Sequence, residues 1–405
     1  MVDYQTNPLS VDLYSRVMAS AFDEKTVIGV PTAFQMFFGR PETNSQTIYS
    51  PNANAVDIDI IRANERIAAL VPRGTNGRMI KEPQENTLSQ RFTNINRVFP
   101  LVVEEGDIEA SQLLNRLAGE NPYERRERRE RLRALSLREH QEQVRRTVRL
   151  FEVLAAQSIL EGKMDAILGT ADPDQQYDFL RNSAHFVTLI TQWSNAAADA
   201  LGDIDDAWDL IRENAHVSAD MAVFGEGAFE AFLQNTDLLA KADNRRFEMI
   251  LVSQEMPVPA RFSRFISAGM TARGRLLTPR GHEIWMFTYS DVYTDSAGTA
   301  TKYMPNEKVL VCYSGARADR YFGPPELLPD IPARRTFYQQ LFGFDVSMPN
   351  MPPNIANEGA AVTPGMFFFD AYAPESWQRV TARMQAAPIY ATTQTDAYVV
   401  ILNAV

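Results

Sequence analysis

The feature that most constrains the fold is a helical pattern about forty residues long, between residues 122 and 162. Asn121 suits the cap before a helix, Pro122 suits its first position, and Gly162 stops the pattern. Its apolar residues fall on one stripe: Ala134, Leu137, Val144, Val148, Phe151, Ala155 and Ile159. At 1.5 Å per residue, such a helix extends on the order of 60 Å. No compact single core is that wide, so we expect a spine along an elongated subunit.

The first half of this helix is strongly basic. ERRERRERLR, residues 124–133, contains six Arg and three Glu, and residues 124–149 contain ten Arg and five Glu. The whole chain has a formal net charge of −11, so its remainder carries −16. A protein that coats nucleic acid through a broad basic surface does not have this balance.

Two interpretations of the Arg run stay open. Glu recurs at every third position of the run, and Glu142 lies three and four residues before Arg145 and Arg146, at spacings where opposite charges pair along a helix. A helix that grips DNA gains nothing from these carboxylates, and no aromatic residues are interleaved to stack on single strands. We therefore favour a helix that faces solvent or another subunit. A nucleic-acid-binding protein acting through the Arg-rich helix 124–149 is the alternative.

Two strands are predicted on either side of a long polar segment. AVDIDII alternates apolar and acidic residues from Val56, with the period of a half-buried strand, and RVFPLVVEEG predicts a second strand at about 97–106. The segment between them is too long for a hairpin turn and too poor in apolar residues to make its own core. Such a span is either disordered or functional, for instance as an arm that folds against another molecule. Residues 1–55 have no sustained period and predict an extended arm.

The middle of the chain, about 165–325, alternates helices with strands. GDIDDAWDLIREN places Ile204, Trp208 and Ile211 on one helical face. Asp203 is a plausible cap for this helix. SADMAVFGEGAFEAFLQN predicts a strand, a tight turn and a helix, while GHEIWMFTYSDVYTD and KVLVCYSG predict strands. An α/β or α+β domain follows.

The end of the chain returns to strands after a Pro-rich segment near 345–364. PIYATTQTDAYVVILNAV predicts two strands around the turn residues Thr393 to Asp396. The single cysteine, Cys312, excludes an intrachain disulfide and is expected to be a small buried residue of a strand.

Three patterns that could carry chemistry have simpler explanations. The turn Gly225-Glu226-Gly227 resembles a phosphate-binding loop, but Glu230 stands where the third glycine of the dinucleotide fingerprint belongs. The acidic cluster lacks the spacing of an EF-hand and suits the first turns of a helix. It comprises Asp203, Asp205, Asp206 and Asp209. The four histidines have no metal-ligand spacing: His140, His185, His216 and His282.

The sequence shows no nucleophile elbow, Walker lysine loop or HExxH helix. We therefore predict no catalytic, cofactor-binding or metal-ligating residues, and a protein that is not an enzyme. The N-terminal sequence has no basic region followed by an apolar stretch, and no apolar run approaches the roughly 20 residues that span a bilayer. We expect a cytoplasm-like compartment, at least during folding.

The order of these elements resembles the lambda-type phage major capsid protein E family. The similar segments are FQMFFGRPETNSQTIY at 34–49, the strand, polar loop and strand from AVDIDII to FPLVVEEGDI, LFEVLAAQSILEGKM at 150–164, VSADMAVFGEGAFEAF, MPNEKVLVCYSGARADRYFGP at 304–324 and RMQAAPIYATTQTDAYVVILNAV. The resemblance spans essentially the whole chain and rests on order and spacing, without an active-site signature.

The resemblance implies an α+β chain with the Hong-Kong-97-type phage capsid fold. It implies an N-terminal arm, an extended loop formed by a long β-hairpin, a peripheral domain with a spine helix at about 122–162, an axial domain and a return to the peripheral sheet. The expected limits are 1–55, 56–105, 106–170, 171–330 and 331–405.

The function implied by this family is a major capsid protein that self-assembles, as hexamers and pentamers, into the icosahedral shell around the double-stranded DNA of a tailed bacteriophage. The expected partners are copies of the chain, a portal protein and scaffold during assembly, and a decoration protein. DNA is expected to be enclosed without sequence-specific binding, and no membrane is involved. The expected location is the virion, after assembly in the host cytoplasm. The alternative with the same fold is an encapsulin-like shell around a cargo protein.

Overall fold

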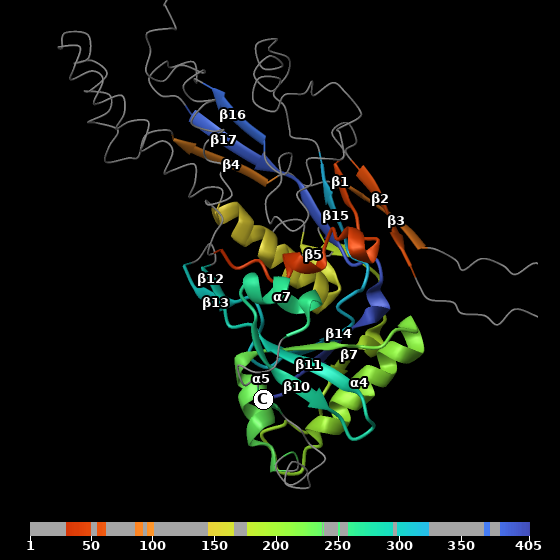
Figure 1. Cartoon of the computed structure of the whole chain (residues 1–405). Coiled ribbons are helices and arrows are strands. Elements are labelled where there is room, and N and C mark those ends of the chain that lie inside the picture. The colour runs from red at the N-terminus through yellow and green to blue at the C-terminus, as the bar shows by residue number, and fades with distance from the viewer. Residues whose placement is uncertain are drawn as a thin grey trace, which may run out of the picture.

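Figure 1 shows a computed structural model of the chain, in which the described parts form an elongated molecule. The structure describes residues 30–49, 55–61, 86–91, 95–100, 145–165, 176–236, 238, 250–251, 258–294, 298–323, 368–372 and 381–405. The arm before residue 30, the Arg run at 124–133 and the Pro-rich segment near 345–364 lie outside these residues. So do Asn121, Pro122 and His140.

A seven-stranded sheet forms the centre of the molecule, in the order β7-β19-β14-β8-β11-β10-β9. The strands are β7 (Phe186–Thr188), β19 (Tyr398–Leu402), β14 (Val309–Cys312), β8 (Met221–Phe224), β11 (Glu283–Thr288), β10 (Thr271–Leu277) and β9 (Ile250–Leu251). β8 runs parallel to β11 and antiparallel to β14. Every residue of β8 and β14 is buried, as expected for strands covered on both faces.

Three helices lie beside this sheet (Figure 1): α4 (Ala200–Ala215), α5 (Glu226–Gln234) and α7 (Ala260–Ser267). The predicted strand, turn and helix of SADMAVFGEGAFEAFLQN are confirmed as β8 and α5, and the strands of GHEIWMFTYSDVYTD and KVLVCYSG are confirmed as β11, β12 and β14. None of the helices among the described residues is both long and apolar enough to pass through a bilayer.

Helix α4 buries the face that its spacing predicts. Ile204, Trp208 and Ile211 are buried together. The predicted cap is wrong, because Asp199 precedes the helix and its side chain accepts the backbone N–H of Gly202 at 3.0 Å. Asp203 lies inside the first turn and accepts instead from Trp193 Nε1 at 2.7 Å. Two Asp in one short stretch are equally good caps by sequence, and tertiary packing decides between them.

The long helix is confirmed over its described part, residues 145–161. Val148, Phe151, Ala155 and Ile159 have no exposed surface, as the stripe predicts. The helix ends at Gly162, whose φ of +66° is the left-handed conformation that glycine adopts without strain. The chain then forms the hairpin β5 (Lys163–Asp165) and β6 (Gln176–Asp178), followed by η6 (Ser183–His185).

The strand predicted at AVDIDII is confirmed as β2 (Ala55–Ile60), which pairs antiparallel with β3 (Asn86–Arg91). The second predicted strand begins slightly earlier, as β4 (Ile95–Pro100), and pairs with β17 (Thr381–Ala386). β16 (Phe368–Tyr372) completes this three-stranded sheet. A hairpin of β12 (Val292–Thr294) and β13 (Ala300–Lys302) is separate from it.

The two predicted C-terminal strands are confirmed as β18 (Pro388–Ala391) and β19, with η8 (Thr395–Ala397) between them. They lie in different sheets. β18 joins β15 (Asp319–Phe322) and β1 (Thr47–Tyr49), whereas β19 lies between β14 and β7. The last strand of the segment 331–405 therefore pairs with the middle region, since its continuous apolar run suits a central strand.

Candidate assembly site

The arm segment, residues 30–49, is attached to the molecule through a buried carboxylate. Glu152 of the long helix has no exposed surface. Its Oε1 accepts hydrogen bonds from the backbone N–H of Phe34 at 2.7 Å and from Tyr289 Oη at 2.9 Å, and its Oε2 accepts from the backbone N–H of Gln35 at 3.1 Å. One side chain thus joins the arm segment, the long helix and the residue that follows β11.

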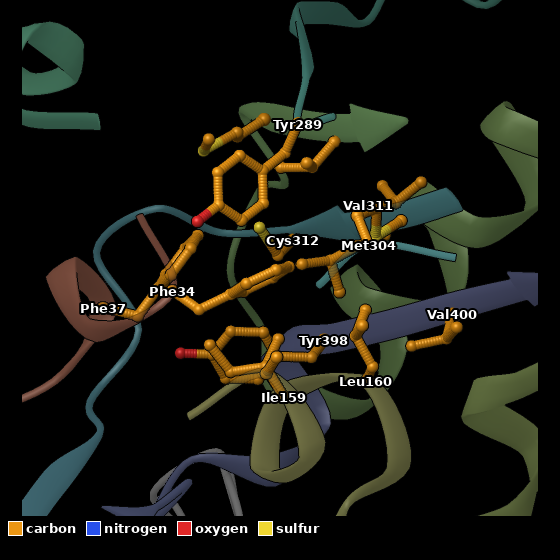
Figure 2. Packing of buried hydrophobic residues seen from close by; sticks show 14 of the residues in the cluster. Phe34, Phe37, Ile159, Leu160, Tyr289, Met304, Val311, Cys312, Tyr398 and Val400 are labelled. Atoms are coloured by element: carbon orange, nitrogen blue, oxygen red, sulfur yellow. The ribbon is translucent and has the colours of Figure 1, made fainter. Parts of the chain in front are cut away.

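Aromatic rings of the arm segment fill the space around this carboxylate. Phe34 packs edge-on against Tyr289, with ring centroids 5.4 Å apart, and Phe37 lies 4.7 Å from Phe265 of α7. Figure 2 shows Phe34 and Phe37 within the same cluster as Tyr398 of β19. The arm segment is therefore part of the core that it covers, and this packing excludes water from Glu152.

Burial raises the pKa of the Glu152 carboxyl to about 7, while its hydrogen bonds from Phe34, Gln35 and Tyr289 oppose this shift. No Lys or Arg among the described residues forms an ion pair with this group. The carboxylate is thus held by neutral donors alone, which is the costly way to bury a charge.

A buried guanidinium attaches the arm segment at a second point. Arg40 donates from Nε to the carbonyl oxygen of Phe37 at 3.2 Å and from Nη2 to that of Ser314 at 2.6 Å. The backbone N–H of Gly39 donates to the carbonyl oxygen of Ala318 at 2.9 Å. Burial, and to a smaller extent Arg264, lowers the pKa of Arg40 to about 10. Beyond this point the arm segment continues as η4 (Pro41–Thr43) and β1.

A second buried guanidinium holds the end of the long helix. Arg181 donates from Nη1 to the carbonyl oxygen of Ile159 at 2.5 Å and from Nη2 to that of Ser158 at 3.2 Å. These carbonyls belong to the last turn, where helix geometry provides no partner. The guanidinium also lies over the rings of Phe186 and Tyr398. The side chain therefore connects the long helix to two strands of the seven-stranded sheet.

The end of β2 that leads into the connection to β3 is attached to the C-terminal turn. Ile58 and Ile60 are fully buried, and the backbone N–H of Ile61 donates to the carbonyl oxygen of Thr393 at 3.0 Å. Thr393 Oγ1 in turn donates to the carbonyl oxygen of Arg317 at 3.0 Å. This end of β2 is thus fixed in the core.

The glycine turn before α5 is filled by protein and not by a ligand. A Cβ on Gly225 would lie 2.1 Å from the carbonyl oxygen of Pro305, so the glycine permits close approach of this loop. The backbone N–H of Ala228 in the first turn of α5 donates to the carbonyl oxygen of Asn306 at 2.7 Å. Glu226 pairs instead with Lys302. The interpretation as an ordinary strand-to-helix turn fits these contacts.

Three of the four Asp side chains in the acidic cluster of α4 are engaged by protein side chains. Asp206 and Asp209 both pair with Arg280, and Asp203 binds Trp193. Within the part of the chain that the structure describes, no group of three or more His, Cys, Asp or Glu side chains is placed to hold a metal ion.

Two of the described histidines have structural partners, and the cysteine is buried. His185 is buried and contacts the Tyr398 carbonyl oxygen through Nδ1 at 3.0 Å, while His282 stacks on Trp208 with centroids 3.5 Å apart. His216 is exposed at the end of α4. Cys312 is fully buried in β14, as predicted, and burial raises the pKa of its thiol well above the usual value.

Glu152, Arg40 and Arg181 were not predicted from the sequence. A signal exists for Glu152, because it lies four residues after Val148 and three before Ala155, within the apolar stripe. An acidic residue at such a position indicates a buried, hydrogen-bonded carboxylate. The two Arg give no comparable signal, since their acceptors are backbone carbonyls that only the tertiary fold brings near.

Several solved structures are similar to this chain. A protein described as a capsid protein of a prophage, from Escherichia coli CFT073, matches with a TM-score of 0.57 and 13% identity, over 96% of this chain and 97% of that chain. An encapsulin complex from Synechococcus elongatus PCC 7942 matches with a TM-score of 0.39 and 10% identity, over 88% and 84% of the two chains.

A subunit of the satellite phage P4 procapsid has a TM-score of 0.38 and 10% identity, over 97% of this chain and 90% of that chain. Of these three structures, only the prophage protein is similar enough to support the fold, which is the Hong-Kong-97-type phage capsid fold with α+β content. No curated protein sequence matches the chain significantly.

The model of the phage major capsid protein E family matches residues 35–336, which is well over half of the chain. This range includes the arm segment from Gln35, the β2–β3 hairpin, the long helix and most of the seven-stranded sheet. The chain therefore belongs to the phage major capsid protein E family.

Proposed function

We propose that many copies of this chain assemble into the icosahedral head shell of a tailed bacteriophage, as hexamers and pentamers around double-stranded DNA. The observation that carries the proposal is the three-way attachment at Glu152. It fixes an arm segment, a long helix and a central sheet into one body, in which the end of β2 is also buried. A rigid body with extended attachments suits a shell in which each subunit overlaps its neighbours.

The five expected segments become the parts of this subunit. We propose that residues 1–55 are the N-terminal arm and that 56–105 are the extended loop over a neighbour. Residues 106–170 then belong to the peripheral domain, and 171–330 form the axial domain at hexamer and pentamer centres. Residues 331–405 return to the peripheral sheet and also contribute β19 to the axial sheet. Because β19 is shared in this way, the two domains of one subunit are linked by strand pairing.

The proposed partners during assembly are a portal protein and scaffold in the host cytoplasm, with a decoration protein on the finished shell. We propose no catalytic role for the chain. Its net charge of −11 supports enclosure of DNA without tight binding, because an acidic shell repels DNA and lets it slide in.

Sedimentation of the expressed full chain tests the assembly. The proposal predicts material of megadalton size, formed alone or with the scaffold and portal genes of the same phage. Sedimentation as a monomer under both conditions contradicts it. Co-sedimentation of a single cargo protein, and not DNA, would identify an encapsulin-like compartment.

Substitution of the Arg residues in 124–149 by Gln tests the nucleic-acid alternative. Assembly that persists while duplex DNA binding is abolished would support a nucleic-acid-binding role. The proposal predicts that the unchanged chain binds duplex DNA weakly in moderate salt.

A further inference from the structure

Glu152 lies in the apolar stripe of the long helix, yet it accepts hydrogen bonds from a distant segment of the chain. The 3₁₀ turn η3 (Gln35–Phe37) follows Phe34, and no side chain of the arm segment caps this turn. Glu152 supplies the missing acceptor from a helix more than a hundred residues later in the chain. Departure of residues 30–39 would uncover this carboxylate and expose it to water.

None of the three groups that donate a hydrogen bond to Glu152 is charged. The Tyr289 hydroxyl donates to it, and the Gln35 side chain donates to the Val148 carbonyl oxygen one turn earlier. Arg40 of the arm segment is engaged with two carbonyl oxygens. The titratable and charged groups that act on Glu152 or on the two buried tyrosines beside it are Tyr289, Tyr293, Tyr303 and Asp291 from the β11–β13 region and Arg149 from the helix.

We propose that Glu152 is a proton-linked latch, so that docking of residues 30–39 is coupled to proton uptake by this carboxyl and release of these residues to proton loss. When the segment is docked, the carboxyl is enclosed and favours its neutral form. When the segment leaves, water solvates the carboxylate and favours the ionised form. The latch lies within one chain, so the proposal does not depend on shell formation.

The direction of the pH effect follows from this coupling. In the docked state, burial holds the pKa of Glu152 at about 7, above its usual value near 4.5, while the hydrogen bonds from Phe34 and Gln35 oppose this shift. The docked state therefore binds the proton more tightly and is favoured at low pH, and this advantage is lost as the pH rises through about 7. The three hydrogen bonds stabilise the ionised form of Glu152 in the docked state. Docking of residues 30–39 therefore weakens at higher pH but is not abolished.

Hydrogen exchange of the Phe34 and Gln35 amides tests the latch, because these N–H groups are its donors. The protection of residues 30–39, normalised to intrinsic exchange, is measured in the full chain from about pH 5.5 to about pH 8.5. We expect protection to fall by up to about tenfold per pH unit as the pH rises towards about 7, as release of one proton dictates, and to level off above that pH. A flat wild-type profile would overturn the proposal.

Three variants separate the latch from other titrations. Glu152→Gln cannot lose a proton, so its profile should be flat, and a wild-type slope in this variant contradicts the proposal. Tyr289→Phe removes a donor to the ionised form of Glu152. It should therefore move the pH at which protection levels off to a higher value. Glu161→Gln alters an exposed carboxylate of the same helix and should retain the wild-type profile.

If Glu152→Gln does not fold, the pH at which protection levels off in Tyr289→Phe tests the latch by itself. If this pH is unchanged, or is lower than in the wild type, the latch proposal is overturned.

Discussion

Arg181 donates a hydrogen bond to the carbonyl oxygen of Ile159, which lies 22 residues earlier in the chain, and thereby caps the long helix from a different segment. Its guanidinium is buried, and burial lowers its pKa to about 10. We predict that Arg181→Leu lowers the free energy of unfolding by about 2 to 4 kcal/mol, because it leaves buried carbonyls without donors. Urea unfolding measures this change.

Lys163→Ala is the matched control for Arg181→Leu. Lys163 follows the same helix end and pairs with Asp178, but about half of each side chain is exposed. Its removal should cost less than about 1 kcal/mol, because water screens the pair. Equal losses for the two variants would contradict the capping role of Arg181.

Gly225 and Gly227 form a second matched pair. Gly225→Ala places a Cβ against the carbonyl oxygens of Pro305 and Asn306 and should destabilise the fold by about 3 kcal/mol or more. Gly227→Ala meets its nearest atom only at 3.3 Å and lies in α5, where Ala is favoured over Gly. Its effect should stay within about 1 kcal/mol. Thermal unfolding of both variants tests this, and similar midpoints would show that the loop does not constrain residue 225.

His185 predicts a loss of stability on acidification. Burial lowers its pKa below the usual 6.5, against the opposing influence of Tyr398 and Asp396. The unfolded chain therefore binds the proton first as the pH falls below about 6.5, which favours unfolding. The contacts agree, because Nε2 of the neutral ring can accept from Asn214 Nδ2 at 3.1 Å, whereas a protonated ring has no free acceptor.

His185→Gln should reduce this acid sensitivity. Urea unfolding of the wild type and the variant at about pH 7.5, 6.5 and 5.5 gives the difference at each pH, which removes the opposite trend that Glu152 contributes. The difference between the two proteins should shrink as the pH falls. A constant difference would mean that His185 does not titrate in this range.

The long helix and the strands could be predicted because their patterns are local. The stripe that contains Val148, Phe151 and Ile159 has the helical period, and AVDIDII has the period of a strand, whatever surrounds them. The order of the strands in the sheets could not be predicted. β18 and β19 are neighbours in sequence, yet they separate into two sheets because β19 pairs with β14 and β7.

The attachments of the arm segment were less predictable still. Glu152 can be recognised as unusual within its stripe, but its partners at Phe34 and Gln35 lie more than a hundred residues away in sequence. The cap of α4 shows the same limit on a small scale, since Asp199 and Asp203 differ only in what packs around them. Hydrogen bonds to backbone groups of distant segments leave no periodic trace in a sequence.

Cys312 provides a simple test of the core. It is fully buried and lies opposite Tyr398 in the pairing of β14 with β19. Burial raises the pKa of its thiol, so the reactive thiolate is scarce in the folded state. We predict that a thiol reagent labels the chain only in denaturant, with a single modification detected by mass spectrometry. Rapid labelling of the folded protein would contradict the buried position.

Electron microscopy of the expressed full chain, alone and with its scaffold, tests the central claim most directly. The account predicts closed shells tens of nanometres across with icosahedral symmetry, in which copies of residues 145–161 lie along the back of each subunit. Particles that remain single, compact monomers under both conditions would contradict it.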